Sequence, residues 1–183
     1  MPDTNRYSGI SIINHWLTAV LVVIMLLIGF AAAFAPEKDI RSYLMGIHVS
    51  VGFFVLLFVL WRVIWRLYEG FPANVGPTAG ERWGAWLVHR LILISLVVQV
   101  LSGPLAIFLG GHAVNVFGWF SFRIPVGESE AVQGILGLVH VYNGLFVLPI
   151  LLGLHVLGGI RFYLFYGRAA GDVTKANRQP EIS

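Results

Sequence analysis

The chain has 183 residues, of which 57% are hydrophobic and 11% are charged, and its mean hydropathy is +0.80. These values indicate an integral membrane protein with a single domain, and they argue against a soluble globular protein. Because the chain has no cysteine, it cannot supply thiolates to an iron–sulfur cluster, a zinc site or a disulfide, and it cannot attach haem covalently. The net charge of +3 comes from basic residues near predicted helix ends, so it indicates topology and not nucleic acid binding.

Four stretches are long and apolar enough to cross the ~30 Å hydrocarbon core of a membrane. The sequence therefore predicts an all-α, four-helix membrane bundle spanning 1–183 as one domain, with a polar tail at 168–183. A polar turn at 35–39, a Gly/Pro-rich loop at 70–77 and a longer aromatic connection at 110–130 separate the helices. The predicted spans are 12–35, 46–68, 84–109 and 133–166.

Basic residues are distributed unequally between the two ends of this bundle. Three of the twelve Lys and Arg residues, Lys38, Arg41 and Arg123, fall on one side, and the other nine fall on the side of both termini. The positive-inside rule then places both termini and the tail in the cytoplasm. We expect a multi-pass protein of the bacterial inner membrane, in contact with lipid. The nine residues on the cytoplasmic side are Arg6, Arg62, Arg66, Arg82, Arg90, Arg161, Arg168, Lys175 and Arg178.

Four histidines lie in or beside the apolar spans, where an ionisable side chain is costly and indicates function. In the predicted topology, His15 and His155 share the cytoplasmic half of the membrane, and His48 and His140 share the outer half. Each pair comes from two different helices, as the two axial ligands of one haem must. The depths therefore predict two bis-histidine haems, with pairs His15/His155 and His48/His140.

Histidines in membrane helices also have roles that involve no haem. A histidine can serve as a hydrogen-bond partner between membrane helices. Pairs of histidines can bind copper or zinc, although such sites usually gather three or four ligands with carboxylate or thiolate help. A proton pump or cation transporter would require acidic residues within the spans, and these are almost absent.

Pro149 lies between the two histidines of the last predicted helix. Fifteen residues separate His140 from His155, which leaves them about 60° apart in azimuth on a regular helix. Proline removes a backbone hydrogen bond and kinks or widens a helix. We expect a π-type turn near Pro149 that absorbs one residue and brings the two histidines closer to one azimuth.

Short motifs in all four spans resemble the bacterial cytochrome b561 family, four-helix dihaem membrane proteins related to the cytochrome b subunits of nickel–iron hydrogenases. The loop 116–125 also looks like the family's segment before the last helix, so the likeness covers most of the chain. The motifs are Ile13-Asn14-His15-Trp16-Leu17, Ile47-His48-Val49-Ser50-Val51-Gly52, Leu60-Trp61-Arg62-Val63-Ile64-Trp65-Arg66, His89-Arg90 and Gly153-Leu154-His155.

This resemblance implies two non-covalent b haems, and His15, His48, His140 and His155 fall on the positions of the family's axial ligands. His89 is expected to donate to a haem propionate, to line a quinone site, or to replace His15 as ligand. Arg62, Arg90 and Arg161 are candidate propionate or quinone contacts, or plain interface anchors. His112 is expected to be solvated in the outer loop.

The predicted function is single-electron transfer across the membrane, because a bis-histidine iron has no open position for oxygen chemistry. Ubiquinone is the expected membrane partner, and the resemblance suggests superoxide as a candidate donor on the outer side. Whether the chain is itself an enzyme, a quinone-linked oxidoreductase, is left open. One alternative is a membrane-anchor subunit that takes electrons from a soluble dehydrogenase or hydrogenase partner; the other is a haem-free structural or sensing bundle.

Overall fold

The computed structural model describes residues 8–71 and 76–176, with side chains as far as Phe165. Within this part of the chain, four helical segments are long and apolar enough to cross a membrane, in agreement with the predicted fold class. The elements are α1 (Gly9–Phe34), α2 (Lys38–Glu69), α3 (Ala79–Leu109), β1 (Val114–Val116), β2 (Phe120–Phe122), α4 (Glu130–Tyr142), the π-helical turn η1 (Asn143–Val147) and α5 (Leu148–Ala176).

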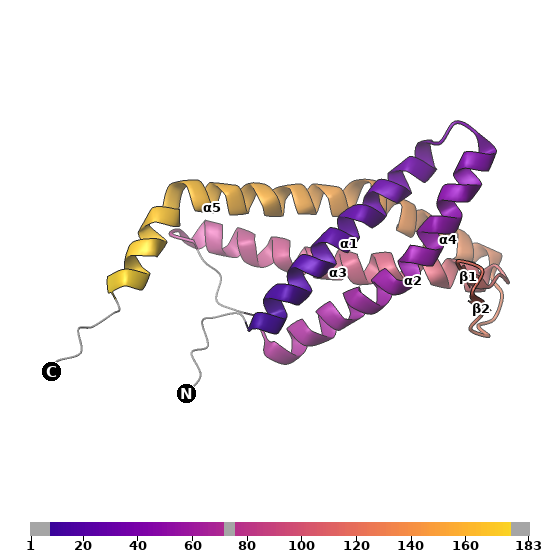
Figure 1. The fold of residues 1–183 in the computed structure, drawn as a ribbon, viewed down its shortest axis with the longest axis horizontal. Helices are drawn as coiled ribbons and strands as arrows, with labels where there is room; N and C mark the ends of the chain where they lie inside the picture. Colours follow the sequence, from indigo (N-terminus) through magenta and orange to yellow (C-terminus); the bar gives the residue numbers. More distant parts are fainter. Residues whose placement is uncertain (1–7, 72–75, 177–183) are drawn as a thin grey trace.

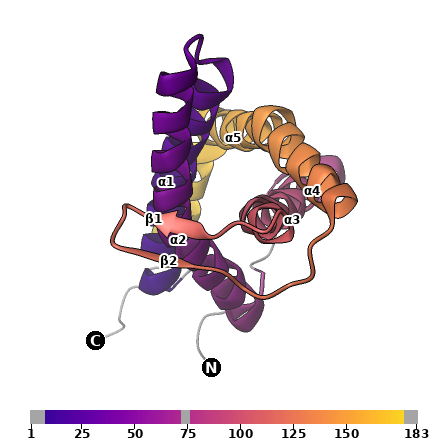
Figure 2. The ribbon, with the colours of Figure 1, turned by 90° about the vertical axis from the view of Figure 1, so that its right-hand side faces the viewer.

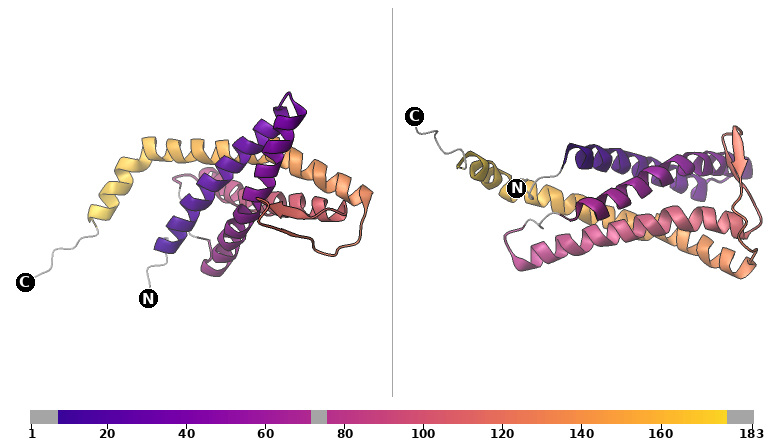
Figure 3. Two further views of the ribbon diagram at one scale, coloured as in Figure 1. Left: turned by 45° about the vertical axis from the view of Figure 1, so that its right-hand side comes forward. Right: turned by 90° about the horizontal axis from the view of Figure 1, so that it is seen from below.

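The helices form two antiparallel hairpins that cross each other (Figure 1). The first hairpin consists of α1 and α2, and the second consists of α3 and the continuous run α4–η1–α5. Seen from below, the two hairpins form two layers (Figure 3). The start of α1 and the end of α5 lie at the same end of the bundle, together with the end of α2 and the start of α3 (Figure 1).

Polar side chains mark where the helices begin. Ser8 accepts a hydrogen bond from the backbone N–H of Ser11 at the start of α1. Thr78 and Glu81 form a reciprocal capping box at the start of α3, which satisfies two backbone donors that a helix otherwise leaves unpaired. Gly70 ends α2 at a φ of +80°, a conformation that glycine adopts without steric cost.

The observed helices extend beyond most of the predicted boundaries. The second helix begins at Lys38 and not near residue 46, because the polar residues of its first turns still continue the helical hydrogen bonding. The last helix continues to Ala176, into the segment that the sequence assigns to the polar tail. Apolar content locates the membrane-spanning part of a helix, and the ends lie further out in polar sequence.

A short β-hairpin closes one end of the bundle and was not predicted. Strands β1 and β2 pair antiparallel, with Val114 opposite Phe122. The hydroxyl of Ser50 in α2 accepts from the N–H of Phe117 at 3.0 Å and donates to the carbonyl of Asn115 at 3.3 Å, which fastens the hairpin to the bundle. Figure 2 shows the hairpin and its flanking loop running across this end.

The π turn expected near Pro149 is present. The π-helical residues are Asn143–Val147, and the N–H of Leu148 bonds back to the carbonyl of Asn143 across the widened turn. Pro149 follows directly within the continuous helical run; it has no N–H to donate to the preceding turn, which favours the widened hydrogen bonding of η1. The prediction of a π-type turn between His140 and His155 is therefore confirmed.

The apolar core lies at mid-depth and is small. Its fully buried residues come from all four spans, and most other large apolar side chains are exposed on the outside of the bundle. Such an exterior is expected where lipid, and not water, covers the helices. The core residues are Val22, Val55, Val59, Leu96 and Leu148.

Candidate functional site

Two histidine pairs join the two helical layers. We name them after the orientation that the sequence predicts: the inner pair is His15 and His155, and the outer pair is His48 and His140. In the inner pair, the ring of His15 on α1 lies 6.2 Å, centroid to centroid, from the ring of His155 on α5. The two ring planes meet at 75°. The structure thus brings together the two histidines that depth alone had paired.

The outer pair repeats this arrangement at the other end of the bundle. The ring centroids of His48 on α2 and His140 on α4 lie 6.0 Å apart, with an interplanar angle of 88°. Each pair therefore takes one ring from the α1–α2 hairpin and one from the other hairpin.

His89 is the third histidine at the inner end. His89 lies on α3, and its ring centroid is 5.0 Å from that of His155. The centroid of His15 is farther from His155, at 6.2 Å. His89 is therefore in ring contact with His155 of the inner pair. His112 lies exposed beyond the end of α3, consistent with a solvated residue.

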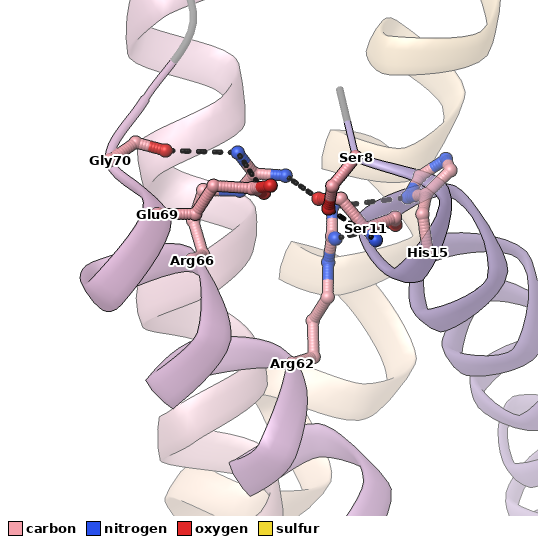
Figure 4. A network of polar contacts seen from close by, with 7 residues as sticks. All are labelled: Ser8, Ser11, His15, Arg62, Arg66, Glu69 and Gly70. Carbon is pink, nitrogen blue, oxygen red and sulfur yellow. Dashed lines mark hydrogen bonds and ion pairs between the residues drawn. The ribbon is translucent and has the colours of Figure 1, made fainter. Parts of the chain in front are cut away.

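A polar cluster surrounds His15 at the inner end (Figure 4). The Arg62 guanidinium lies 3.3 Å from Nδ1 of His15 and 3.4 Å from the carbonyl of Ser11. Arg66 is almost fully buried, donates to Ser11 Oγ at 2.6 Å and to the carbonyl of Gly70 at 2.9 Å, and pairs with Glu69. Two cations therefore reach the inner end of the bundle from consecutive turns of α2.

Comparison with known proteins identifies the family. The family model for prokaryotic cytochrome b561 matches residues 6–167. This chain belongs to the prokaryotic cytochrome b561 family. It is also 27% identical over 139 residues to cytochrome b561 homolog 2 of Escherichia coli (strain K12), covering 75% of this chain and 74% of that protein. The family implies a multi-pass bacterial membrane protein that binds haem b and functions in electron transport.

The centroid separations of the two pairs are compatible with two imidazole ligands on one metal. With a metal–nitrogen bond of about 2.0 Å and a ring nitrogen roughly 1.1 Å from its centroid, two imidazoles on opposite sides of one metal have centroids about 6.2 Å apart. The observed 6.2 Å and 6.0 Å agree with this value. In the described residues no group of three or more His, Cys, Asp or Glu could hold a metal ion, so each pair offers two ligands. The residues present fit two bis-histidine b haems.

The hydrogen bonds of the rings indicate which nitrogen is available in each. A carbonyl only accepts, so Nδ1–H of His140 donates to the carbonyl of Gln99 at 3.0 Å, which leaves the lone pair on Nε2. The side-chain amide of Gln99 lies 3.3 Å from this Nε2 and would have to move before a metal could bind there. A guanidinium only donates, so Nδ1 of His15 accepts from Arg62. The ring hydrogen of a neutral His15 is then on Nε2. Arg62 must leave Nδ1, and the hydrogen must move to Nδ1, before Nε2 can coordinate a metal. Nδ1 of His48 is buried and has no hydrogen-bond partner within the described structure.

Two glycines on neighbouring helices support the outer pair, and sequence reasoning missed both. A Cβ built on Gly103 of α3 would lie 2.8 Å from Cε1 of His140, and one built on Gly29 of α1 would lie 3.2 Å from Cε1 of His48. Gly29 and Gly103 are distant in sequence from the rings that they touch, so no local pattern could have identified them.

The other predicted arginine contacts are engaged elsewhere. The Arg90 guanidinium stacks over the rings of Trp86 and Phe71, at 4.1 Å and 4.5 Å from their centroids. Arg161 forms an ion pair with Glu81 at 2.7 Å, linking α5 to the start of α3. Of the predicted arginines, Arg62 is the one seen in hydrogen-bond contact with a histidine, and haem or quinone contacts by Arg90 and Arg161 stay predictions.

Proposed function

We propose that this cytochrome b561 family member is a dihaem electron-transfer protein that carries single electrons across the membrane. His15 and His155 would hold one haem b, and His48 and His140 the other. The observation that carries the proposal is the pair of matched ring separations, 6.2 Å and 6.0 Å, at opposite ends of one bundle. A structural role for the histidines would not require two cross-layer pairs with the same spacing.

Each haem would supply a one-electron redox centre, and the chain determines what that centre can do. Two histidines on one iron would leave no position for oxygen or substrate, so the chemistry of each centre would be restricted to electron transfer. His140 and His155 are separated by about 22 Å of helical rise, which spreads the two centres over most of the hydrocarbon core. Together they would form a path between the two membrane surfaces.

The apolar core lies between the two pairs. Val22 and Val55 each follow the pair histidine of their own helix by seven residues, and Leu148 lies between His140 and His155. These side chains exclude water from the middle of the bundle. Electrons can cross such a dry layer by tunnelling, whereas ions and hydrated protons cannot enter it without a large desolvation cost.

The electron donor and acceptor are proposed from chemistry. Ubiquinone is the proposed membrane partner, since it dissolves in lipid and binds in apolar pockets with few polar contacts. Superoxide is a candidate donor at the outer face, which carries Lys38, Arg41 and Arg123. Arg123 is already paired with Glu128 at 2.7 Å, and Arg41 donates to the carbonyl of Ala35. Glu128 therefore offsets the charge of Arg123, whereas Arg41 keeps its charge, and direct reduction assays decide whether superoxide is the donor.

The test is a reduced-minus-oxidised visible spectrum of the purified protein, with a pyridine haemochrome assay for haem per chain. We expect two b haems in the wild type and one in each of His48→Ala and His155→Ala. His112→Ala is the matched control and should keep both. A colourless protein after expression with ample haem, or loss of neither haem in the two ligand variants, would contradict the proposal.

The same preparation distinguishes the remaining alternative. Direct reduction by ubiquinol or by superoxide supports a self-contained electron carrier. Reduction only after adding a soluble dehydrogenase or hydrogenase partner supports a membrane-anchor subunit.

A further inference from the structure

A second polar cluster lies on the side of the outer pair that faces mid-membrane. It consists of Ser95, Gln99 and Ser102 on α3 and Asn143 at the start of η1, and we refer to it as the α3–π cluster. Ser95, Ser102 and Asn143 are 5%, 3% and 7% exposed. Burying polar groups at this depth is costly, so they are expected to have a function beyond packing.

Asn143 joins the π turn to α3 through three hydrogen bonds. Its Oδ1 accepts from Ser95 Oγ at 2.7 Å, and its Nδ2 donates to the Ser95 carbonyl at 2.9 Å and to Gln99 Oε1 at 2.7 Å. The Gln99 side chain lies directly over Gly144, where a Cβ would come within 2.8 Å of its amide nitrogen. The second residue of the π turn therefore has to be small for Gln99 to take this position.

Gln99 and Ser102 then contact both nitrogens of the His140 ring. The Gln99 carbonyl accepts from Nδ1–H at 3.0 Å, the Ser102 hydroxyl lies 3.2 Å from the same nitrogen, and the Gln99 amide lies 3.3 Å from Nε2. A carbonyl acceptor at Nδ1 and an amide donor at Nε2 demand the same tautomer, with the hydrogen on Nδ1. The cluster thus fixes both the orientation and the protonated nitrogen of this one histidine. A metal bound at Nε2 would displace the Gln99 amide and leave the Nδ1 contacts in place.

We propose that the α3–π cluster is a positioning device for His140, with Asn143 and Ser102 as its positioning residues. This inference rests on the proposed role of His140 as an axial ligand. A carbonyl that accepts from the far nitrogen of a ligating imidazole makes it a stronger base and keeps the ring in one orientation. A more basic ligand stabilises the oxidised iron, so the cluster lowers the midpoint potential at the outer pair relative to an unsupported histidine.

The experiment measures both haem midpoint potentials by spectroelectrochemistry in the full-length protein. Asn143→Leu removes the link between the π turn and α3, and Ser102→Ala removes the hydroxyl beside Nδ1 with little risk to folding. Ser102→Thr keeps a hydroxyl and serves as the conservative variant. Thr18→Val is the matched control, because Thr18 is a buried hydroxyl on α1 with no hydrogen-bond partner in the described structure. His155→Ala, which should retain only the outer haem, assigns the potentials.

We expect an upward shift of the outer potential in Asn143→Leu and a smaller one in Ser102→Ala, with the inner potential unchanged. Ser102→Thr and Thr18→Val should match the wild type. Two bound haems with the same outer potential in all variants would overturn the inference. If Asn143→Leu does not fold, the difference in outer potential between Ser102→Ala and Ser102→Thr tests the inference.

A readout without haem separates this inference from the proposed function. Nitrogen-15 NMR of histidine-labelled apoprotein reports the tautomer of each ring. His140 should carry its hydrogen on Nδ1 in the wild type and exchange between tautomers in Asn143→Leu. A wild type that binds no haem would contradict the proposed function. An identical His140 tautomer in the wild type and in Asn143→Leu would overturn the positioning role, whether or not haem binds.

Discussion

At the scale of single residues, the contact between Gly103 and His140 shows how closely the outer pair is packed. A Cβ at Gly103 would lie 2.8 Å from Cε1 of His140, a distance that requires the ring to move. The ring is held on both nitrogens by α3, so it cannot move without losing hydrogen bonds. We therefore expect Gly103→Ala to cost about 1–3 kcal/mol in overpacking and to reduce haem occupancy of the outer site.

Haem per chain and the difference spectrum check this prediction. Gly29→Ala should have a smaller effect, since its Cβ would lie 3.2 Å from His48. Gly84→Ala is the control on the same helix as Gly103, because a Cβ there would meet no atom of the described structure within 4 Å. A Gly103→Ala protein with two haems and wild-type potentials would show that the ring has more freedom than its contacts indicate.

Where a residue is conspicuous by type, the sequence alone was enough to select residues that the structure brings close together. Histidines are rare in membrane spans, so His15, His48, His140 and His155 could be selected and paired by depth alone. Gly29 and Gly103 could not be selected, because glycine is common in membrane helices and its partner ring lies on another helix. The same limit applies to Asn143, whose importance depends on residues of α3.

At the scale of elements, the π turn accounts for the geometry of the last span. A π turn is a regular helix with one residue inserted, so η1 makes the fifteen-residue interval from His140 to His155 equivalent to about fourteen α-helical residues. Deleting Phe146, an exposed residue of η1, should therefore restore a regular helix and keep both histidines facing the bundle.

Deleting Ile150 provides the contrast. Ile150 is also exposed on the lipid side, but it lies in regular α-helix beyond the π turn. Its removal rotates His155 by ~100° relative to His140 and separates the inner pair. We expect two haems in the Phe146 deletion and one in the Ile150 deletion, measured as haem per chain. Equal haem content in the two proteins would contradict this account of the π turn.

Other elements were harder to predict. Pro149 indicated the π turn because proline has a known effect on helix hydrogen bonding. The β-hairpin also has a signal in the sequence: apolar and polar residues alternate on both sides of Phe117-Gly118, a period of two that is typical of paired strands. In the structure Phe117 and Gly118 take positive φ angles of 52° and 73°, as tight hairpin turns require.

Across the molecule, the histidine pairs lie between two hairpins that also meet in the mid-depth core and where the β-hairpin packs on α2. Hydropathy was sufficient to predict four spans in an all-α bundle, because span length is fixed by membrane thickness. It could not predict how the two hairpins cross, since lipid-facing and bundle-facing apolar residues look alike in sequence. The pairing of the histidines does not depend on this crossing, because it requires only the depth of each histidine along the membrane normal.

The orientation of the bundle decides which pair exchanges electrons with the outside, and it is a prediction from charge distribution alone. The chain has no cysteine, so single cysteines can report accessibility without background. Trp119→Cys in the β-hairpin and Ala79→Cys at the start of α3 lie at exposed positions near opposite ends of the bundle. With both termini cytoplasmic, a membrane-impermeant maleimide added to intact spheroplasts should label the first variant and not the second. After the membrane is permeabilised, both should be labelled. The reverse pattern in intact spheroplasts would place His15 and His155 at the outer surface, and the donor would then have to deliver electrons to the pair that Arg62 and His89 contact.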